Sequence, residues 1–291
     1  MNLNQSQLFK LQQTANHAAT HAGHYIQSQL DQTHEVQGKS GGDSLASQVV
    51  TEVDLRAQEI ILSLLNPSIQ KFDLGLLTEE TIDDLSRLNK DYFWCVDPLD
   101  GTLPFTERQP GFAVSIALIA KSGDPVVGVV YLPNEAKCYS TIKGEGVVLN
   151  DKPFSRATLR DDQKLHWYMD RSFMSTNFFD EVKSKMHAWA KEQQLDLEMY
   201  STNGAVANAI GVMTSKNGYY FKFPKKTNGG GSIWDYAATR LLFEELNLQV
   251  SNANRKQLHL NDPETTFMNR QGVVYATSHI DSDLVLQLMD H

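Results

Sequence analysis

Two carboxylates, Asp97 and Asp100, follow an apolar run at residues 93–96 that is typical of the end of a buried strand. Pro98 fixes φ and Gly101 tolerates a positive φ, so a tight turn is predicted at this strand end. Such a turn can crowd both carboxylates onto one site, where like charges are costly unless a cation lies between them. Oxygen ligands of this kind suit Mg²⁺ or Mn²⁺. Taken alone, the pattern is more typical of a polar turn with solvated acids.

Further acids lie at expected element boundaries, at helix starts or in the turn after a strand. They are Asp54, Glu79, Glu80 and Asp235. Each has an ordinary explanation as a helix cap or a charged turn. Together with the two aspartates of the turn, they are the residue types that a phosphoryl-transfer site with several Mg²⁺ ions needs. In such a site carboxylates hold the ions, which bridge phosphate oxygens and activate a water molecule.

Composition narrows the class of protein. The chain has 291 residues, of which 41% are hydrophobic and 21% charged, which suits one large domain or two intimately packed ones. Its net charge of -9 gives no general attraction to a nucleic acid polymer or an anionic membrane. The two cysteines, Cys95 and Cys138, are too few for a disulfide framework or a cysteine metal site. No apolar run is long enough to span a membrane and no signal peptide is evident, so a cytoplasmic location is expected.

The first half of the chain is predicted to combine helices with an antiparallel meander. Apolar spacing predicts a helix over residues 3–30, and a second helix is expected to start at Asp54 and to end at Pro67. A short strand at residues 72–77 should lead into the acidic turn, and a polar loop at residues 82–90 should return the chain. The meander strands are expected at residues 112–120, 126–132 and 138–142. A glycine-rich loop at residues 34–43 could act as a lid if it lies near an active site.

Three histidines on the first predicted helix need separate consideration. His17 and His21 have the i,i+4 spacing of metal ligands, and His24 follows one turn later. No acid lies near them on that face of the helix. We therefore expect them to form a solvated face.

The second half alternates strands and helices, which argues for an α/β arrangement. Strands are expected at residues 164–170, 197–200, 218–223 and 272–277, and helices at 178–193, 203–213, from Asp235, and at 284–289. We expect residues 1–155 to form an α+β half with a mostly antiparallel sheet and the main metal-binding motifs. Residues 156–291 are expected to form an α/β half that contributes Asp235 and substrate contacts. The active site would lie in the cleft between them.

Three acidic signatures in this order resemble those of the inositol monophosphatase superfamily. They are Thr78-Glu79-Glu80-Thr81, Trp94-Cys95-Val96-Asp97-Pro98-Leu99-Asp100-Gly101-Thr102 and Ile233-Trp234-Asp235-Tyr236-Ala237-Ala238. The resemblance runs from about residue 39 to about residue 245. It implies a layered αβαβα sandwich of the inositol monophosphatase/fructose-1,6-bisphosphatase type. It also implies a Mg²⁺-dependent phosphatase, of the inositol monophosphatase or 3'(2'),5'-bisphosphate nucleotidase kind.

The resemblance assigns a role to each motif residue. Glu79, Asp97 and the Leu99 carbonyl would bind one Mg²⁺, and Asp97, Asp100 and Asp235 a second. A third ion would be held by Glu79 with water, and Mn²⁺ could replace Mg²⁺. The pair formed by Thr102 and Asp54, with Glu79, would orient and deprotonate the attacking water. The backbone N–H groups of Gly101 and Thr102, at the start of a short helical turn, would face the phosphate, with Asp100 beside it.

The substrate is less well defined by the sequence. After the turn the chain reads Leu103-Pro104-Phe105, which matches neither the inositol phosphatase pattern nor that of the nucleotidases. Where an acid that contacts inositol is expected, near residues 220–222, lysines occur instead, at Lys222, Lys225 and Lys226. They could bind a second phosphate or belong to a solvated loop, and both interpretations stay open. Gly204 and Ala205 match the place where the family's helix start approaches the substrate.

The sequence therefore predicts Mg²⁺-dependent hydrolysis of a small-molecule phosphate ester, as in inositol monophosphatases. One alternative is a bisphosphate nucleotidase that acts on 3'-phosphoadenosine 5'-phosphate. A less favoured one is a metal-binding regulatory protein without turnover. Superfamily members are often dimers, so a homodimer is an assembly that the resemblance allows.

Overall fold

The structure is a computed structural model that describes residues 2–32, 36–38, 49–229, 231–277 and 288. Most of the predicted loop at residues 34–43 and of the predicted last helix at residues 284–289 lies outside the described residues. Within them, no helix is long and apolar enough to cross a membrane.

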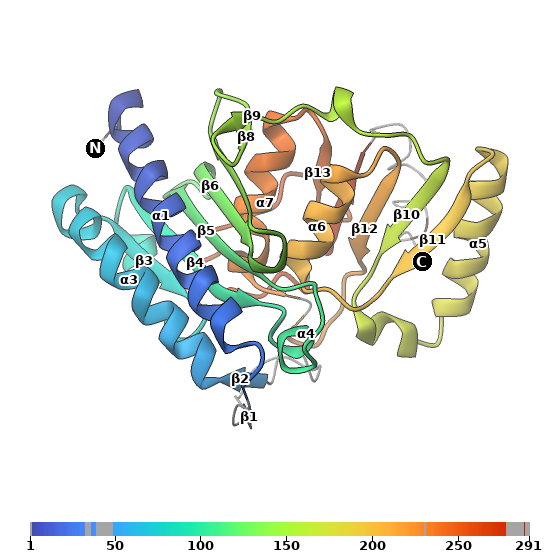
Figure 1. The fold of residues 1–291 in the computed structure, drawn as a ribbon, viewed down its shortest axis with the longest axis horizontal. Helices are drawn as coiled ribbons and strands as arrows, with labels where there is room; N and C mark the ends of the chain where they lie inside the picture. The colour runs from blue at the N-terminus through green and yellow to red at the C-terminus, as the bar shows by residue number, and fades with distance from the viewer. Residues whose placement is uncertain (1, 33–35, 39–48, 230, 278–287, 289–291) are drawn as a thin grey trace.

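Helices and sheets alternate in layers, as Figure 1 shows. The outer helices α1 (Gln5–Gln29) and α3 (Glu52–Phe72) cover one face of a seven-stranded sheet. α6 (Ala205–Thr214) and α7 (Ile233–Glu245) fill the space between this sheet and a five-stranded sheet, and α5 (Phe179–Glu192) covers the far face of the latter. The predicted layered αβαβα sandwich is confirmed.

The larger sheet has the strand order β3-β4-β5-β6-β7-β8-β9. Its strands are β3 (Gly75–Thr78), β4 (Tyr92–Asp100), β5 (Ala113–Ala120), β6 (Pro125–Leu132), β7 (Lys137–Ile142), β8 (Val147–Leu149) and β9 (Lys152–Pro153). From β4 to β9 neighbouring strands are antiparallel, which confirms the meander, and β3 joins β4 in parallel. β4 is buried along almost its whole length because helices cover both faces of the sheet.

The smaller sheet has the order β11-β10-β12-β14-β13. Its strands are β10 (Lys164–Tyr168), β11 (Asp196–Tyr200), β12 (Gly218–Lys222), β13 (Gln249–Ser251) and β14 (Val273–Ala276). β10 pairs in parallel with both β11 and β12, so the chain leaves these strands at one edge of the sheet. α7 packs against β5 and β6 of the larger sheet, although it follows the strands of the smaller one. The division at residue 155 therefore remains a proposal.

Four details of the predicted first half were wrong. Thr51, not Asp54, caps α3: its backbone is extended and its side chain accepts a hydrogen bond from the Val53 N–H, while Asp54 lies in the first turn. Pro67 does not end α3, because burial of residues around it, such as Leu65, offsets the lost backbone hydrogen bond. The helix continues to Phe72, so the strand expected at residues 72–77 starts only at Gly75.

The fourth difference is in the segment at residues 82–90, which contains a 3₁₀ turn (Ser86–Leu88) rather than only a polar loop. Its Arg87 is buried. The guanidinium donates to Asp83, to Asn261 Oδ1 and to the Asp262 carbonyl. The segment that follows the acidic turn is thereby anchored to the chain between β13 and β14. This anchor could not be read from sequence because Asn261 and Asp262 lie 174 and 175 residues from Arg87.

Candidate active site

Three carboxylates meet between the two sheets. Asp97 and Asp100 lie at the end of β4, and Asp235 lies in the first turn of α7. Each offers an oxygen within 4.8 Å of the others. They converge because α7 packs across β4 and its neighbours with its N-terminus at this strand end. The structure thus brings together three of the predicted metal-binding residues.

Asp97 has a buried carboxylate oxygen that accepts no hydrogen bond in the described structure. Its Oδ1 accepts a hydrogen bond from the Leu99 N–H at 3.1 Å, whereas Oδ2 is buried without a hydrogen-bond partner in the described structure. Burial, then repulsion by Glu79 and Asp235, raises the pKa of Asp97 well above its ordinary value. A buried carboxylate oxygen without a donor is costly, and a divalent cation would satisfy it.

Asp100 is held by the start of α6. Its two carboxylate oxygens accept from the backbone N–H groups of Ala205 and Val206 at 3.0 and 2.9 Å. These two hydrogen bonds favour the charged form, but burial and the charge of Asp235 outweigh them and raise the pKa of Asp100. Gly204 is required here, because a Cβ at this position would lie 2.3 Å from Asp100 Oδ2. In the structure, Gly204 and Ala205 therefore contact Asp100. Their predicted contact with substrate remains a proposal.

Asp235 is fixed by its own helix start and faces a lysine. The Ser232 N–H donates to Asp235 Oδ2 at 2.6 Å. Burial raises the pKa of Asp235, and the charge of Lys222 is the largest influence that opposes this shift. Asp97, Asp100 and Asp235 are referred to below as the acid cluster. Lys222, one of the predicted substrate residues, thus lies beside this cluster.

The acidic turn after β3 is positioned by a glutamine on α3. Gln58 accepts from the Thr78 hydroxyl and from the Glu80 N–H, and it donates to Thr81. The Glu79 N–H donates to the Val96 carbonyl at 3.2 Å, which continues the parallel pairing of β3 with β4. Glu79 therefore lies alongside Asp97, and its charge is the largest electrostatic influence on that carboxylate.

Asp54 and Thr102 form a buried hydrogen-bonded pair. Thr102 Oγ1 donates to Asp54 Oδ1 at 2.8 Å and also lies 3.2 Å from the Leu99 carbonyl. The other carboxylate oxygen of Asp54 accepts from the N–H and the hydroxyl of Thr51. Burial raises the pKa of Asp54 to about 6, against the effect of these hydrogen bonds. A buried base with a pKa close to neutral is suited to proton transfer.

The turn between these groups has the predicted form. Gly101 has φ of 85° and precedes the short helix α4 (Thr102–Thr106). A Cβ on Gly101 would lie 2.8 Å from the Gly111 carbonyl, so both the conformation and the space require glycine. This turn brings Thr102 back towards the Leu99 carbonyl.

A second polar group, formed by Asp170, Tyr220, Lys222 and Tyr236, adjoins the acids. The Lys222 ammonium lies 2.7 Å from Asp170 Oδ2, and the two side chains are 13% and 28% exposed. The Tyr220 hydroxyl donates to Asp170 Oδ1 at 3.0 Å, and the Tyr236 ring lies 5.5 Å from the ammonium. Burial alone would lower the pKa of Lys222, but Asp170, Tyr236 and Asp235 raise it above its ordinary value.

Lys225 and Lys226 are placed differently from Lys222. The backbone N–H of Lys225 donates to the Asn269 carbonyl, and Asn269 donates back to the Lys225 carbonyl. Lys226 is exposed. Their predicted role with a second phosphate remains a proposal.

Sequence reasoning missed several residues that position the site. They are Thr51, Gln58, Asp170 and Ser232. Thr51 could have been found, since it precedes Asp54 by three residues in a capping-box pattern. Asp170 and Gln58 carry no local signal, because they reach the site through sheet and helix packing.

The arrangement fits divalent cations bound by oxygen. Asp97, Asp100, Asp235 and the nearby Glu79 provide several carboxylates, and Lys222 is already paired with Asp170. Such a set suits Mg²⁺ or Mn²⁺ rather than soft metals. Beside it, Asp54 and Thr102 provide a proton acceptor and a hydroxyl.

Comparisons with known proteins agree with this geometry. Residues 7–289 match the protein-family model described as the inositol monophosphatase family. The "Nus factor SuhB" of Escherichia coli strain K12 is 29% identical over 241 residues, which cover 81% of this chain and 82% of that protein. An "Inositol-1-monophosphatase" of Synechocystis sp. is 32% identical over 171 residues, or 58% of this chain and 54% of that protein. The solved structure of a Thermotoga maritima IMPase superposes with a TM-score of 0.71 at 19% identity, over 94% of both chains, and supports the fold.

Proposed function

Because the chain belongs to the inositol monophosphatase family, we propose that it is a Mg²⁺-dependent phosphatase that hydrolyses a small phosphomonoester. The observation that carries this proposal is the buried, unpartnered Oδ2 of Asp97 within the acid cluster, next to the Asp54–Thr102 pair. Glu79, Asp97, the Leu99 carbonyl, Asp100 and Asp235 would hold two or three Mg²⁺ ions. Bound there, the ions would acidify a water molecule and offset the charge of the phosphate.

The chain's own residues would handle the proton. The attacking water would donate a hydrogen bond to Thr102 Oγ1, which donates to Asp54 Oδ1. As the water oxygen bonds to phosphorus and the ester oxygen leaves, one water proton would pass through Thr102 to Asp54. Thr51 keeps Asp54 in place because it occupies the other carboxylate oxygen. Neither cysteine is needed as a nucleophile, and burial keeps the pKa of Cys95 above its ordinary value.

The Asp170–Lys222 pair favours a polyol phosphate such as an inositol monophosphate as the substrate class. The pair presents a donor and an acceptor side by side, with little net charge, next to Asp235. Such a pair complements hydroxyl groups, which both donate and accept. Asp170 would thereby supply the carboxylate that the sequence of β12 lacks.

A bisphosphate nucleotidase is the second candidate, favoured by the position of Lys222 beside the acid cluster. A second phosphate would gain from the ammonium group. It would also meet the carboxylate of Asp170 next to that ammonium, and this repulsion makes the bisphosphate the weaker candidate.

A regulatory protein without turnover is the third candidate, since one relative is named a Nus factor. It needs the fold and a metal but not the Asp54–Thr102 pair. The presence of this pair, with the full acid set, supports an enzyme.

The deciding experiment is a comparison of phosphate release from inositol 1-phosphate and 3'-phosphoadenosine 5'-phosphate in saturating Mg²⁺. We expect turnover of the inositol phosphate at the higher kcat/KM. A higher value for the bisphosphate would favour the nucleotidase, and no release from any phosphomonoester above the level of Asp97→Asn would refute an enzyme.

Two variants with a matched control test the contact with substrate. Asp170→Asn should raise the KM for the inositol phosphate about tenfold, since a lost hydrogen bond to a charged group costs roughly 1.5–3 kcal/mol. Replacement of Lys222, Lys225 and Lys226 by alanine should raise the KM for a bisphosphate only if lysines bind its second phosphate. Lys152→Ala, at an exposed position on β9, is the control and should change neither value.

A further inference from the structure

A second group of ligand side chains lies on the outer face of the molecule. His17, His21 and His24 lie on α1. This helix covers one face of the larger sheet, and α6 and α7 cover the opposite face (Figure 1). They are exposed, as the sequence predicts for a solvated face. They are not part of the acid cluster, so its chemistry does not account for them.

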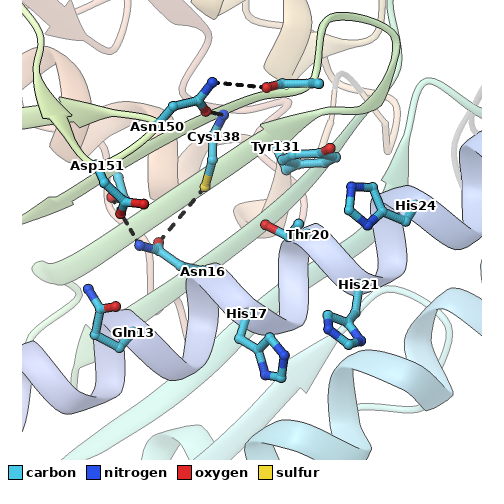
Figure 2. A pocket seen from close by; sticks show the side chains of 12 residues that line it. Gln13, Asn16, His17, Thr20, His21, His24, Tyr131, Cys138, Asn150 and Asp151 are labelled. Carbon is cyan, nitrogen blue, oxygen red and sulfur yellow. Dashed lines mark hydrogen bonds between the residues drawn. The ribbon is translucent and has the colours of Figure 1, made fainter.

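The three histidines line a pocket of about 500 Å³ between α1 and strands β6 and β7 (Figure 2). The lining also contains the amides of Gln13 and Asn16 and the hydroxyl of Thr20. Asp151, in the turn between β8 and β9, lines the same pocket. Asp151 comes from a distant turn, and its carboxylate does not form a group of three ligand atoms within 4.8 Å with His17 and His21. Among the twelve described residues of the lining none is Lys or Arg, so the pocket favours a cation.

His17 and His21 are already in contact. Their ring centroids are 4.0 Å apart with the planes at 70°, and Figure 2 shows both rings on one side of α1. The helix that carries them is rigid, because Ala15, Ala18 and Ala22 are fully buried beneath it. The helix therefore fixes the separation of the two Cα atoms, and the contact between the rings already holds them next to each other. His24 packs edge-on against Tyr131 and points along the same pocket.

We propose that His17 and His21 bind one first-row transition-metal ion of the Zn²⁺ or Ni²⁺ type, at a site separate from the acid cluster. Imidazole nitrogen suits these ions, whereas Mg²⁺ prefers oxygen. Two histidines one helical turn apart are a known zinc-ligand spacing. In the described part of the chain, only the acid cluster gathers three ligand atoms within 4.8 Å. The histidine site is therefore a two-ligand site, completed by water from the pocket.

Cys138, which also lines the pocket, is not one of the ligands. Its thiol is only partly buried, and its Sγ does not form a group of three ligand atoms within 4.8 Å with His17 and His21. Burial, followed by the charge of Asp151, also raises its pKa to about 12. Metal ions bind the thiolate rather than the thiol. Loss of Cys138 should therefore leave metal binding intact.

The test is a calorimetric titration of the full chain with Ni²⁺ in saturating Mg²⁺, which occupies the acid cluster. The wild type should bind one Ni²⁺. The His17→Gln, His21→Gln double variant should lose this ion or bind it with an affinity lower by about tenfold or more, since changes to residues around the ligands already reduce metal affinity roughly 10–100-fold. His187→Gln is the matched control, because His187 is an exposed histidine on α5 with lysines four residues to either side. Equal affinity in wild type and double variant would overturn the proposal.

A second readout separates this proposal from the proposed phosphatase. Ni²⁺ should raise the melting temperature of the wild type and of Asp97→Asn, but not that of the double variant, because a bound ion stabilises the folded state. The double variant should keep its rate of phosphate release. A Ni²⁺ effect that disappears in Asp97→Asn would place the ion at the acid cluster and contradict a separate site.

Discussion

Asp97, Asp100 and Asp235 form a largely buried cluster of carboxylates, whereas His17 and His21 form an exposed pair of imidazoles on one helix. The carboxylates come from two elements far apart in the sequence, and each is held by a backbone N–H group of a turn or helix start. The histidines come from successive turns of α1, and the helix alone sets their separation.

This difference shows what each site costs the fold. In the acid cluster, burial and mutual repulsion raise the pKa values of Asp97 and Asp100, so the folded state disfavours their charged forms, and a bound cation would offset this cost. Carboxylates whose pKa values are shifted in this way are typical of functional sites. The exposed histidines carry no comparable cost. The two sites also differ in ligand type, so hard and borderline metal ions should distribute differently between them.

The largest expected effect is the loss of activity in Asp97→Asn. The variant loses a charge from the centre of the acid cluster, and we expect kcat/KM to fall roughly 10³-fold, because metal ions contribute several kcal/mol of transition-state stabilisation. The measurement is phosphate release in saturating Mg²⁺, with circular dichroism as the check on folding. A folded variant with full activity would contradict the role of the acid cluster and remove the contrast between the two sites.

Gly204→Ala tests whether the acid cluster depends on a distant element. The added Cβ would lie 2.3 Å from Asp100 Oδ2, so Asp100 must move away from the start of α6. A displacement of this size can reduce activity about 10²-fold. Gly144→Ala is the control: Gly144 has φ of 86° but nothing within 4 Å of its added Cβ, so stability should fall while the rate per folded molecule stays the same. Unchanged activity in Gly204→Ala would show that the contact with α6 is not needed.

The same contrast between local and long-range contacts explains which parts of the fold and of the site could be predicted from the sequence. Periodicity predicted α1, the meander and the strands of the second half, because these patterns depend on residues close in sequence. The acids were found through their motifs, and only the turn from Asp97 to Thr102 has a shape that local residues dictate. Asp170 and Gln58 could not be predicted, because only the packed sheets bring them to the site. The strand β13, with three residues, is too short to leave a pattern.

The stability of the metal-free protein should fall as pH rises, and Mg²⁺ should reverse the fall. Burial raises the folded-state pKa of Asp54 to about 6 and that of Asp97 well above its ordinary value near 4, so the folded state binds more protons than the unfolded state. Their contribution to stability is complete below the unfolded pKa and is lost as pH rises through the folded values. The melting temperature with chelator and with saturating Mg²⁺ should therefore diverge with increasing pH. Asp97→Asn is the control and should show a smaller divergence, and an equal one would contradict the assignment to the acid cluster.

The smallest expected effect is that of the His17→Gln, His21→Gln double variant on stability without transition metals. Both side chains are exposed, and the buried alanines beneath them remain, so the free energy of unfolding should change by about 0.5 kcal/mol or less. Glutamine has a helix propensity at least as good as that of histidine, which leaves α1 intact. Chemical denaturation in chelator measures the change. A loss of several kcal/mol would show that the two rings stabilise the packing of α1. The histidine pair would then, like the acid cluster, depend on contacts with the rest of the fold.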